Sequence, residues 1–198
     1  HLSSGPHRMS PHADDIPEEH HALVERLRAG DVDALDALLQ SYWRGVVPFA
    51  ARALGDDEAA QDVAQETFIR LWRARADLTG DRFRAYLYRV ARNLVTDEVR
   101  RRDVRSRWVE HSTAETAYEP LPDQVLITRE LNLAIAHAIE ALTPRRREAF
   151  VLAYLHGLSY KEVADAMGVS TSTVKNQIAA ALADLRTALS PSDPNRPA

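Results

Sequence analysis

The chain has 198 residues, of which 45% are hydrophobic, so it can form one domain of moderate size or two small ones. It contains no cysteine, which excludes a disulfide framework, a thiol nucleophile and a cysteine-bound metal. No apolar run is long enough to cross a membrane and no signal peptide is recognisable, so we expect a cytoplasmic, mostly helical protein. The formal net charge is −4, so any contact with nucleic acid must come from local basic patches or be assisted by a partner.

The charge is unevenly spread along the chain. Residues 10–62 hold 12 acidic residues against 4 arginines, whereas residues 82–107 hold 9 arginines against 3 acidic residues. The acidic part indicates a basic partner or plain solubility, and the arginine-rich part indicates phosphate contacts. Because a charge run is often only a solvated face, each part needs its own argument.

The N-terminal part begins with a segment that we do not expect to fold. Residues 1–17 are interpreted as a tag remnant and a disordered leader. The histidines up to His21 could be metal ligands, but a flexible, proline-containing leader gives them no fixed geometry, so no metal site is predicted. A helix is then predicted over Glu18–Ala29, and Gly30 ends it.

Two longer helices should follow. Asp31 or Asp33 can cap the first, which has a broad apolar face and should be kinked or broken at Pro48. The second is predicted over residues 56–75. Its exposed side carries Asp62, Gln65, Glu66, Arg70 and Arg73. Asp62 and Glu66 could be paired catalytic or metal-binding carboxylates, but no histidine lies beside them, so a solvated face or a docking surface for a basic partner is favoured.

After a predicted loop, residues 82–102 form an arginine-rich amphipathic helix. The residues at helical spacing on its inward face are Phe83, Leu87, Val90, Ala91 and Leu94. A separate polar stripe is formed by Arg89, Asn93, Asp97 and Arg100, with Arg101 and Arg102 at the end. Aromatic residues interleaved with arginines suit single-stranded DNA, because arginine follows the backbone and an aromatic ring can stack on an unpaired base. An ordinary amphipathic helix with its aromatic residues in the core would give the same pattern.

The stretch 104–123 loses helical periodicity and is long for a loop, so a linker and a domain boundary are predicted there. Helical spacing returns from Gln124 to Leu142, and Pro144 then begins a helix in which Phe150, Val151, Tyr154 and Leu155 should face inward. Residues 190–198 are a proline-rich tail without a core role.

Residues 158–186 are typical of a helix-turn-helix. Ser159 and Glu162 form a capping-box pattern, Gly168 suits a helix end, and Ser170 can cap the second helix. In that helix the predicted buried stripe is Val174, Ile178, Ala181, Leu182 and Leu185. The polar residues left near its N-terminus are Ser170, Thr171, Ser172, Thr173, Lys175, Asn176 and Gln177. The second helix of a helix-turn-helix enters the major groove by its N-terminal end, and Asn, Gln, Lys and Thr can all contact base edges, although a plain helical hairpin would show the same pattern.

Taken together, these segments resemble bacterial sigma factors of the sigma-70 superfamily, in the short extracytoplasmic-function group. The resemblance rests on DDEAAQDVAQETFIRLWR (56–73), similar to region 2.2; FRAYLYRVARNLVTDEVRR (83–101), similar to regions 2.3 and 2.4; and LTPRRREAFVLAYLHGLSYKEVADAMGVSTSTVKNQI (142–178), similar to region 4. The chain differs from many relatives in having Tyr86 where they have tryptophan. Its recognition helix also continues as residues 178–182, IAAAL, where relatives often carry arginine.

The resemblance implies an all-α fold of two small helical domains joined by a flexible linker: a region 2-like domain over 18–103 and a region 4-like domain over 124–189. It implies binding to core RNA polymerase and promoter DNA, without catalysis or a cofactor. The polymerase clamp coiled coil would contact Asp62, Gln65, Glu66, Arg70 and Trp72. The −10 element, held as a single strand, would contact Arg82, Phe83, Tyr86, Arg89, Asn93, Asp97, Arg100 and Arg101. The recognition helix residues 170–177 would read the −35 duplex, with help from the polymerase flap, and an anti-sigma protein would restrain the factor.

Three other classes of function remain as alternatives. A free-standing helix-turn-helix regulator would bind duplex DNA without polymerase, but it would leave the helix 83–101 without a role. A helical metal-dependent hydrolase using Asp62 and Glu66 would lack a histidine–carboxylate cluster. An inhibitor of transcription would not need the polar residues 170–177.

Overall fold

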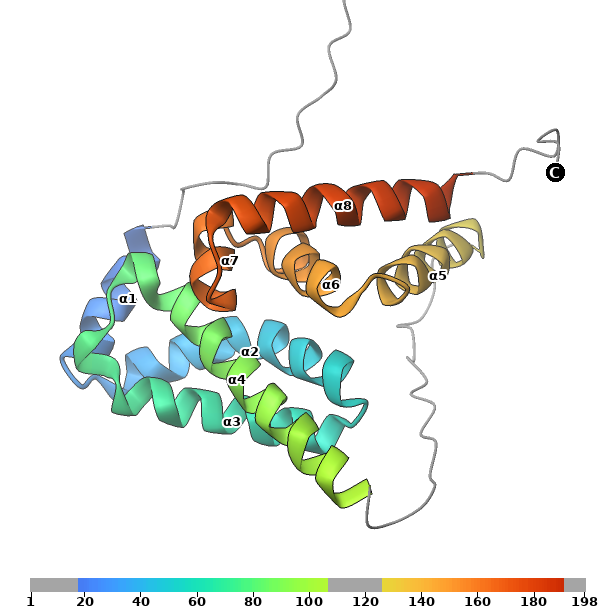
Figure 1. Ribbon diagram of the computed structural model, residues 1–198. Coiled ribbons are helices and arrows are strands. Elements are labelled where there is room, and N and C mark those ends of the chain that lie inside the picture. The colour runs from blue at the N-terminus through green and yellow to red at the C-terminus, as the bar shows by residue number, and fades with distance from the viewer. Residues whose placement is uncertain (1–17, 107–125, 191–198) are drawn as a thin grey trace, which may run out of the picture.

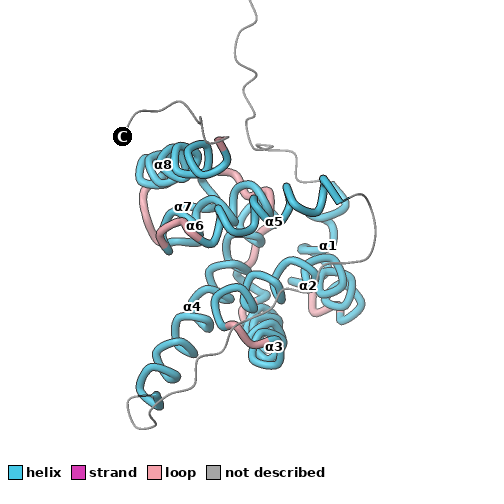
Figure 2. The backbone as a smooth tube through the Cα atoms, turned by 90° about the vertical axis from the view of Figure 1, so that its right-hand side faces the viewer, coloured by secondary structure: helices cyan, strands magenta, loops and turns pink. Residues whose placement is uncertain are grey.

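The computed structural model describes residues 18–106 and 126–190, and side chains are described except within 103–132. Every regular element in these ranges is helical, with no strand among them (Figures 1 and 2), which confirms the predicted all-α fold. The predicted leader, the linker from residue 107 onward and the tail beyond Ser190 lie outside the described residues. None of the described helices is both long and apolar enough to cross a membrane.

The N-terminal half consists of α1 (Glu18–Arg28), α2 (Val32–Leu54), α3 (Asp57–Arg73), the short 3-10 turn η1 (Arg75–Asp77) and α4 (Gly80–Ser106). Asp31 caps α2 by accepting from the amides of Asp33 and Ala34, and Asp56 caps α3 by accepting from Ala59 at 3.1 Å. Gly55 ends α2 in the left-handed conformation, with φ 63°, which costs glycine little. The cap at Asp31 confirms one of the two starts that the sequence predicts for α2.

Several helix bounds in this half differ from the prediction: α3 ends at Arg73 and not at residue 75, and α4 begins at Gly80 and not at residue 82. Helix α2 continues unbroken through Pro48, because Val46 and Ala50 on either side are fully buried and their packing outweighs one missing backbone hydrogen bond. Helix α4 runs on to Ser106, so it includes the first residues that were assigned to the linker.

The C-terminal half consists of α5 (Leu126–Glu140), α6 (Pro144–Phe150), the π-helical turn η2 (Val151–Leu155), α7 (Tyr160–Met167) and α8 (Thr171–Leu189). Both bonds of the predicted capping box are present, since the Ser159 amide donates to Glu162 at 2.7 Å and the Glu162 amide donates to the Ser159 hydroxyl at 3.3 Å. Gly168 ends α7 with φ 67°, and Ser170 caps α8. The helix-turn-helix is therefore confirmed.

The π-helical turn corrects one prediction about the core. Leu155 was expected to face inward but is 52% exposed, whereas Leu152 and Leu158 are fully buried. A π turn adds a residue to the helical repeat, so side chains that follow it rotate away from the face that a 3.6-residue period predicts. Sequence periodicity alone gives no sign of this insertion.

The two halves share one hydrophobic core. Leu87 of α4, Leu38 of α2 and Leu71 of α3 lie in the same cluster as Leu152 and Val163 of the C-terminal half. Helix α7 packs directly on α4, and α6, α7 and α8 lie together on that side of the molecule (Figures 1 and 2). The described part of the chain is thus a closed arrangement, and the sequence did not predict how the two halves are placed against each other.

Candidate nucleic-acid interface

The N-terminal end of α8 presents the first candidate surface. Thr171, Ser172, Lys175 and Asn176 are exposed, and Gln177 is half-buried. On the opposite face Val174 and Ile178 are buried, together with Ala181 and Leu185, as the spacing predicts. The polar residues therefore form an open face at the end of a rigid helix, as direct reading of a major groove requires.

Within this surface the hydroxyl groups already have partners. The Ser170 hydroxyl accepts from the Thr173 amide at 3.1 Å and lies 2.8 Å from the hydroxyls of both Ser172 and Thr173. Ser170 is thus first of all the helix cap. This leaves Lys175, Asn176 and Gln177 as the long side chains best placed to contact bases.

Helix α4 presents the second surface, along one side of its length. Arg82, Arg89, Asn93, Asp97 and Arg100 are all exposed, as the polar stripe predicts. The Arg89 guanidinium lies 5.0 Å from the centre of the half-buried Tyr86 ring, a cation–π contact that combines a positive charge with a flat apolar face. This pair has the chemistry that an unpaired base and its phosphate require.

One predicted member of that surface is wrong. Phe83 is only 1% exposed, and its ring packs against His20 and Tyr42 with centroid distances of 5.3 and 5.4 Å. A buried ring cannot stack on a base. Phe83 belongs to the inward face that the helical spacing also predicts. The sequence pattern fitted a core residue and a base-stacking residue equally well.

Three arginines of α4 have structural partners instead. Arg102 donates to the Leu54 carbonyl at 2.9 Å and to the Asp56 carboxylate at 2.8 Å, which joins α4 to the α2–α3 corner. Arg84 and Arg92 both point to the C-terminal half. The exposed Arg101 lies 3.6 Å from a Glu98 oxygen. Sequence reasoning could not single out Arg84, Arg92 and Arg102 as structural, since each bonds to a residue at least 46 positions away.

The outer side of α3 forms the third surface. Asp62, Gln65 and Arg70 are exposed, and Arg70 pairs with Glu66 at 2.8 Å. Ile69, which sequence reasoning missed, is 45% exposed between them. Trp72 is half-buried, with the Arg75 guanidinium 4.3 Å from its ring. A single exposed isoleucine is common on protein surfaces, so Ile69 adds apolar area to this face without by itself marking a docking surface.

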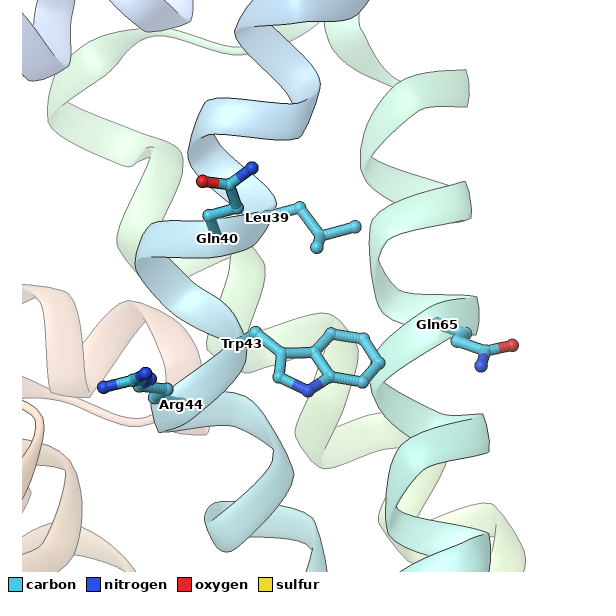
Figure 3. A pocket seen from close by; sticks show the side chains of 5 residues that line it. All are labelled: Leu39, Gln40, Trp43, Arg44 and Gln65. Carbon is cyan, nitrogen blue, oxygen red and sulfur yellow. The ribbon is translucent and has the colours of Figure 1, made fainter.

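A groove lies between α2 and α3 beside this surface (Figure 3). Its volume is about 760 Å³. The residues that line it are Leu39, Gln40, Trp43, Arg44 and Gln65. The Trp43 side chain points from α2 toward Gln65 on α3 (Figure 3), so the groove continues the predicted polymerase surface onto α2. The sequence marked Trp43 and Leu39 only as part of an apolar face.

The structure adds nothing to the enzymatic interpretation of Asp62 and Glu66. Glu66 is paired with Arg70, and no group of three or more His, Asp or Glu side chains gathers anywhere in the described ranges 18–106 and 126–190.

A helix-turn-helix with an open polar face, together with a helix that carries exposed arginines beside the half-buried Tyr86, indicates a helical DNA-binding protein. Comparison with known families makes this specific. Residues 38–105 match Sigma-70 region 2, and residues 132–185 match Sigma-70, region 4. The order of the two matches is the one that the sequence motifs predict.

Relatives extend the similarity over most of the chain. It is 31% identical over 184 residues to RNA polymerase sigma-H factor of Pseudomonas aeruginosa, covering 88% of this chain and 95% of that protein. It is 33% identical over 173 residues to ECF RNA polymerase sigma factor SigL of Mycobacterium tuberculosis, covering 85% and 96%. A solved structure of CnrH in complex with the cytosolic domain of CnrY matches with a TM-score of 0.60 and 26% identity, covering 85% of this chain and 95% of that one.

The chain therefore belongs to the sigma-70 family of RNA polymerase sigma factors, in its extracytoplasmic-function group. Its function is that of a promoter-specificity factor in transcription initiation. The two family matches together disfavour the alternative of a free-standing helix-turn-helix regulator, because such a regulator would not need a region 2 half.

Proposed function

We propose that each of the three surfaces of this sigma factor binds a different partner. The α8 end reads the −35 duplex, the exposed stripe of α4 holds the melted −10 strand, and the outer side of α3 docks on core RNA polymerase. The observation that carries this proposal is that each surface is exposed while the apolar face of the same helix is buried in the core. The folded protein therefore presents all three surfaces on rigid helices.

For the −35 element the readers are Lys175, Asn176 and Gln177, with Thr171 and Ser172 beside them. Asn and Gln can pair bidentately with adenine, and Lys can reach guanine or a phosphate. Ser170 and Thr173 act mainly by holding the first turn of α8, because their hydroxyls are bonded to each other. No arginine follows in residues 178–182, so grip on the backbone is weak and the polymerase flap supports the contact.

For the −10 element the readers are Tyr86 with Arg89, followed along α4 by Asn93 and Arg100, with Arg82 and Arg101 at its ends. Holding an extruded base costs a few kcal/mol of stacking, which an aromatic and cationic surface can offset. Asp97 lies within the stripe and disfavours close approach of a phosphate there. We therefore expect two groups of contacts to the strand along α4, one at Tyr86 and Arg89 and one at Arg100, separated by Asp97.

For core polymerase the contact consists of Asp62, Gln65, Glu66 and Arg70, extended by Ile69 and by the groove at Trp43. The charged residues give steering toward a basic coiled coil, and the apolar residues give buried area. Trp72 supports this contact from below, since its ring is half-buried under Arg75.

The factor acts in the cytoplasm, where polymerase and promoters are found, and it makes no covalent bond itself. An anti-sigma protein restrains it. Support for this comes from the structural match to CnrH, which was solved with the cytosolic domain of CnrY.

Run-off transcription tests the proposal. Core RNA polymerase is incubated with genomic promoter fragments, with and without this protein, and specific transcripts are expected only when it is added. The absence of transcripts, combined with a shift of duplex DNA by the protein alone, would contradict the proposal and favour a free-standing regulator.

A further inference from the structure

Helix α1 precedes the part of the chain that matches region 2, yet it packs on the start of α4 and on η1 (Figure 1). Leu78, in the segment that leads from η1 into α4, is 3% exposed and belongs to the same buried cluster as Val24 and Leu27 of α1. Helix α1 therefore borders the point where the proposed −10 surface begins.

Two neighbouring histidines of α1 make the contact with α4. The His20 ring lies against the rings of Phe83 and Tyr42, with centroid distances of 5.3 and 5.7 Å. The His21 Nε2 atom lies 3.0 Å from the Asp81 carboxylate. Because an ionised carboxylate only accepts hydrogen bonds, Nε2 of His21 carries a proton and donates it to this bond. The bond keeps the pKa of Asp81 below its usual value, so the carboxylate stays ionised at neutral pH.

The His21 ring also lies directly over Gly80, the first residue of α4. Gly80 is buried, and a Cβ added there would lie 2.1 Å from the Cδ2 atom of His21, which is too short for two carbon atoms that are not bonded to each other. A side chain at residue 80 would therefore displace the ring. The close fit on Gly80 and the bond to Asp81 together hold the first turn of α4 against α1.

The same turn carries Arg82, the first of the residues proposed to bind the −10 strand. Arg82 is exposed and lies four positions before Tyr86, which in turn lies three before Arg89, so these side chains follow one side of the helix. The first turn of a helix lacks intrahelical partners for its amides, and helix ends fray. The direction of the Arg82 side chain therefore depends on the contacts that anchor this turn.

We propose that His21 is a positioning residue for −10 recognition, which holds the first turn of α4 through Gly80 and Asp81 and so fixes Arg82 against the DNA strand. This inference rests on the function proposed above and adds a residue from another helix to its strand-binding site. His20 supports the arrangement by seating α1 on Tyr42 and Phe83. His21 acts through Arg82 and makes no contact with the strand itself.

The test measures strand binding by the holoenzyme. Core RNA polymerase is saturated with the protein and titrated with a fluorescent single-stranded oligonucleotide that carries the non-template −10 sequence upstream of the run-off start sites. His21→Ala should weaken binding by about 3- to 10-fold, because the first turn loses its anchor and Arg82 its fixed place. His21→Gln keeps a donor and should recover most of the affinity.

Matched controls separate positioning from stability. His137→Ala makes the same change at an exposed position of α5 and should leave strand binding unchanged. The side chains of His21 and Asp81 are 41% and 86% exposed, so loss of their pair should leave the midpoint of urea unfolding almost unchanged. A weaker grip on the strand at an unchanged midpoint is the result that a merely structural histidine would not give.

A double-mutant cycle shows whether His21 acts through Arg82. Arg82→Ala alone should weaken binding at least as much as His21→Ala, and adding His21→Ala to it should change little further. Gly80→Ala should reproduce the loss by displacing the His21 ring, and it should have little effect in the His21→Ala background, where the space is free. Gly80→Ala is also the second route to the answer where His21→Ala does not fold by circular dichroism.

Three results would overturn the proposal. Unchanged strand binding by a folded His21→Ala or Gly80→Ala variant would show that the first turn needs no anchor. Losses that add in the double variant would show that His21 acts independently of Arg82. An equal loss in His21→Gln would exclude the bond to Asp81 as the cause. Specific run-off transcripts from the unaltered protein test the proposed function before any variant is made, so the two failures are distinguishable.

Discussion

Helices α4 and α8 both carry polar and cationic residues suited to DNA, but they present them in different ways. In α8 these residues lie at a capped N-terminal end, with Lys175 and Asn176 exposed. In α4 they lie on two sides of one helix, with Arg89 exposed and Arg92 covered by Glu148. The N-terminal end of α8 is exposed in this structure, whereas each side of α4 is exposed or covered according to what packs against it.

This difference shows that residue type alone does not identify a DNA contact. Three arginines of α4 within 14 positions of one another have different roles. Arg89 stacks on Tyr86, Arg92 pairs with Glu148 in the other half, and Arg102 bonds to the α2–α3 corner. Exposure and existing partners decide which arginines are available to phosphate. The predictions below test this comparison, beginning with the largest effect.

Phe83 separates the core side of α4 from its DNA side. Phe83→Ala should destabilise the protein by about 3–5 kcal/mol, because it leaves a cavity beside His20 and Tyr42. Urea unfolding followed by circular dichroism measures the change. A loss below about 0.5 kcal/mol, as is usual at exposed positions, would restore Phe83 as a surface residue.

The covered side of α4 should also be sensitive to acid. Burial, with smaller effects from Arg52 and Arg84, lowers the pKa of His156 from 6.5 to about 4. The unfolded chain therefore binds more protons than the folded protein in this range. Stability is fully present above pH 6.5 and is lost as the pH falls toward 4.

We expect about 2 kcal/mol less unfolding free energy from His156 at pH 4.5 than at pH 7. Burial, then His21 and Arg84, lowers the pKa of His20 to about 4 in the same way, so both histidines contribute. Urea unfolding at the two pH values measures the total, and His156→Gln should reduce the difference between them. An equal pH difference in this variant would mean that His156 is not covered in solution. The Arg84 bond to the residue 156 carbonyl survives the substitution, since it uses the backbone.

The open end of α8 should show the opposite behaviour, with little effect on folding and a direct effect on recognition. Asn176→Ala and Lys175→Ala should each cost about 1–3 kcal/mol of −35 discrimination if they contact bases. Run-off transcription on promoters with single −35 substitutions measures this. Unchanged promoter preference in both variants, with normal unfolding, would remove these residues from the recognition surface.

Local rules were sufficient for much of this architecture. The capping box at Ser159, the glycine end at Gly168 and the cap at Asp31 each depend on residues within a few positions, and all three are present. Features that depend on distant partners were not predictable. The π turn at Val151–Leu155 turned Leu155 outward. The packing of the C-terminal half on α4 gave Arg84 and Arg92 partners at least 56 positions away, His156 after that turn and Glu148 in α6.

The candidate site follows the same division. The α8 surface was predictable because the apolar spacing correctly gave the buried face of the helix, which leaves Lys175 and Asn176 on the exposed face. The α4 surface was only partly predictable. The helical spacing placed Phe83 correctly on the inward face, whereas the resemblance placed it at the −10 strand, and no local pattern showed which arginines have distant partners. The groove at Trp43 was missed since it forms only where α2 and α3 meet.

The smallest expected effect is the difference in stability between variants of Arg100 and Arg102, two positions apart on α4. Arg102→Ala should cost about 1 kcal/mol of stability, because the Leu54 carbonyl loses its donor and α4 loses a contact with the α2–α3 corner. Arg100→Ala should change stability by less than about 0.5 kcal/mol, since Arg100 is exposed and makes no ion pair with a described residue. Strand binding should respond in the reverse order, with a loss for Arg100→Ala that diminishes at high salt. A different result would contradict this comparison: Arg102→Ala weakening strand binding more than Arg100→Ala at equal stability. The DNA-binding side of α4 would then extend past Arg100. Having a hydrogen-bond partner in the fold would no longer distinguish structural arginines from those that bind DNA.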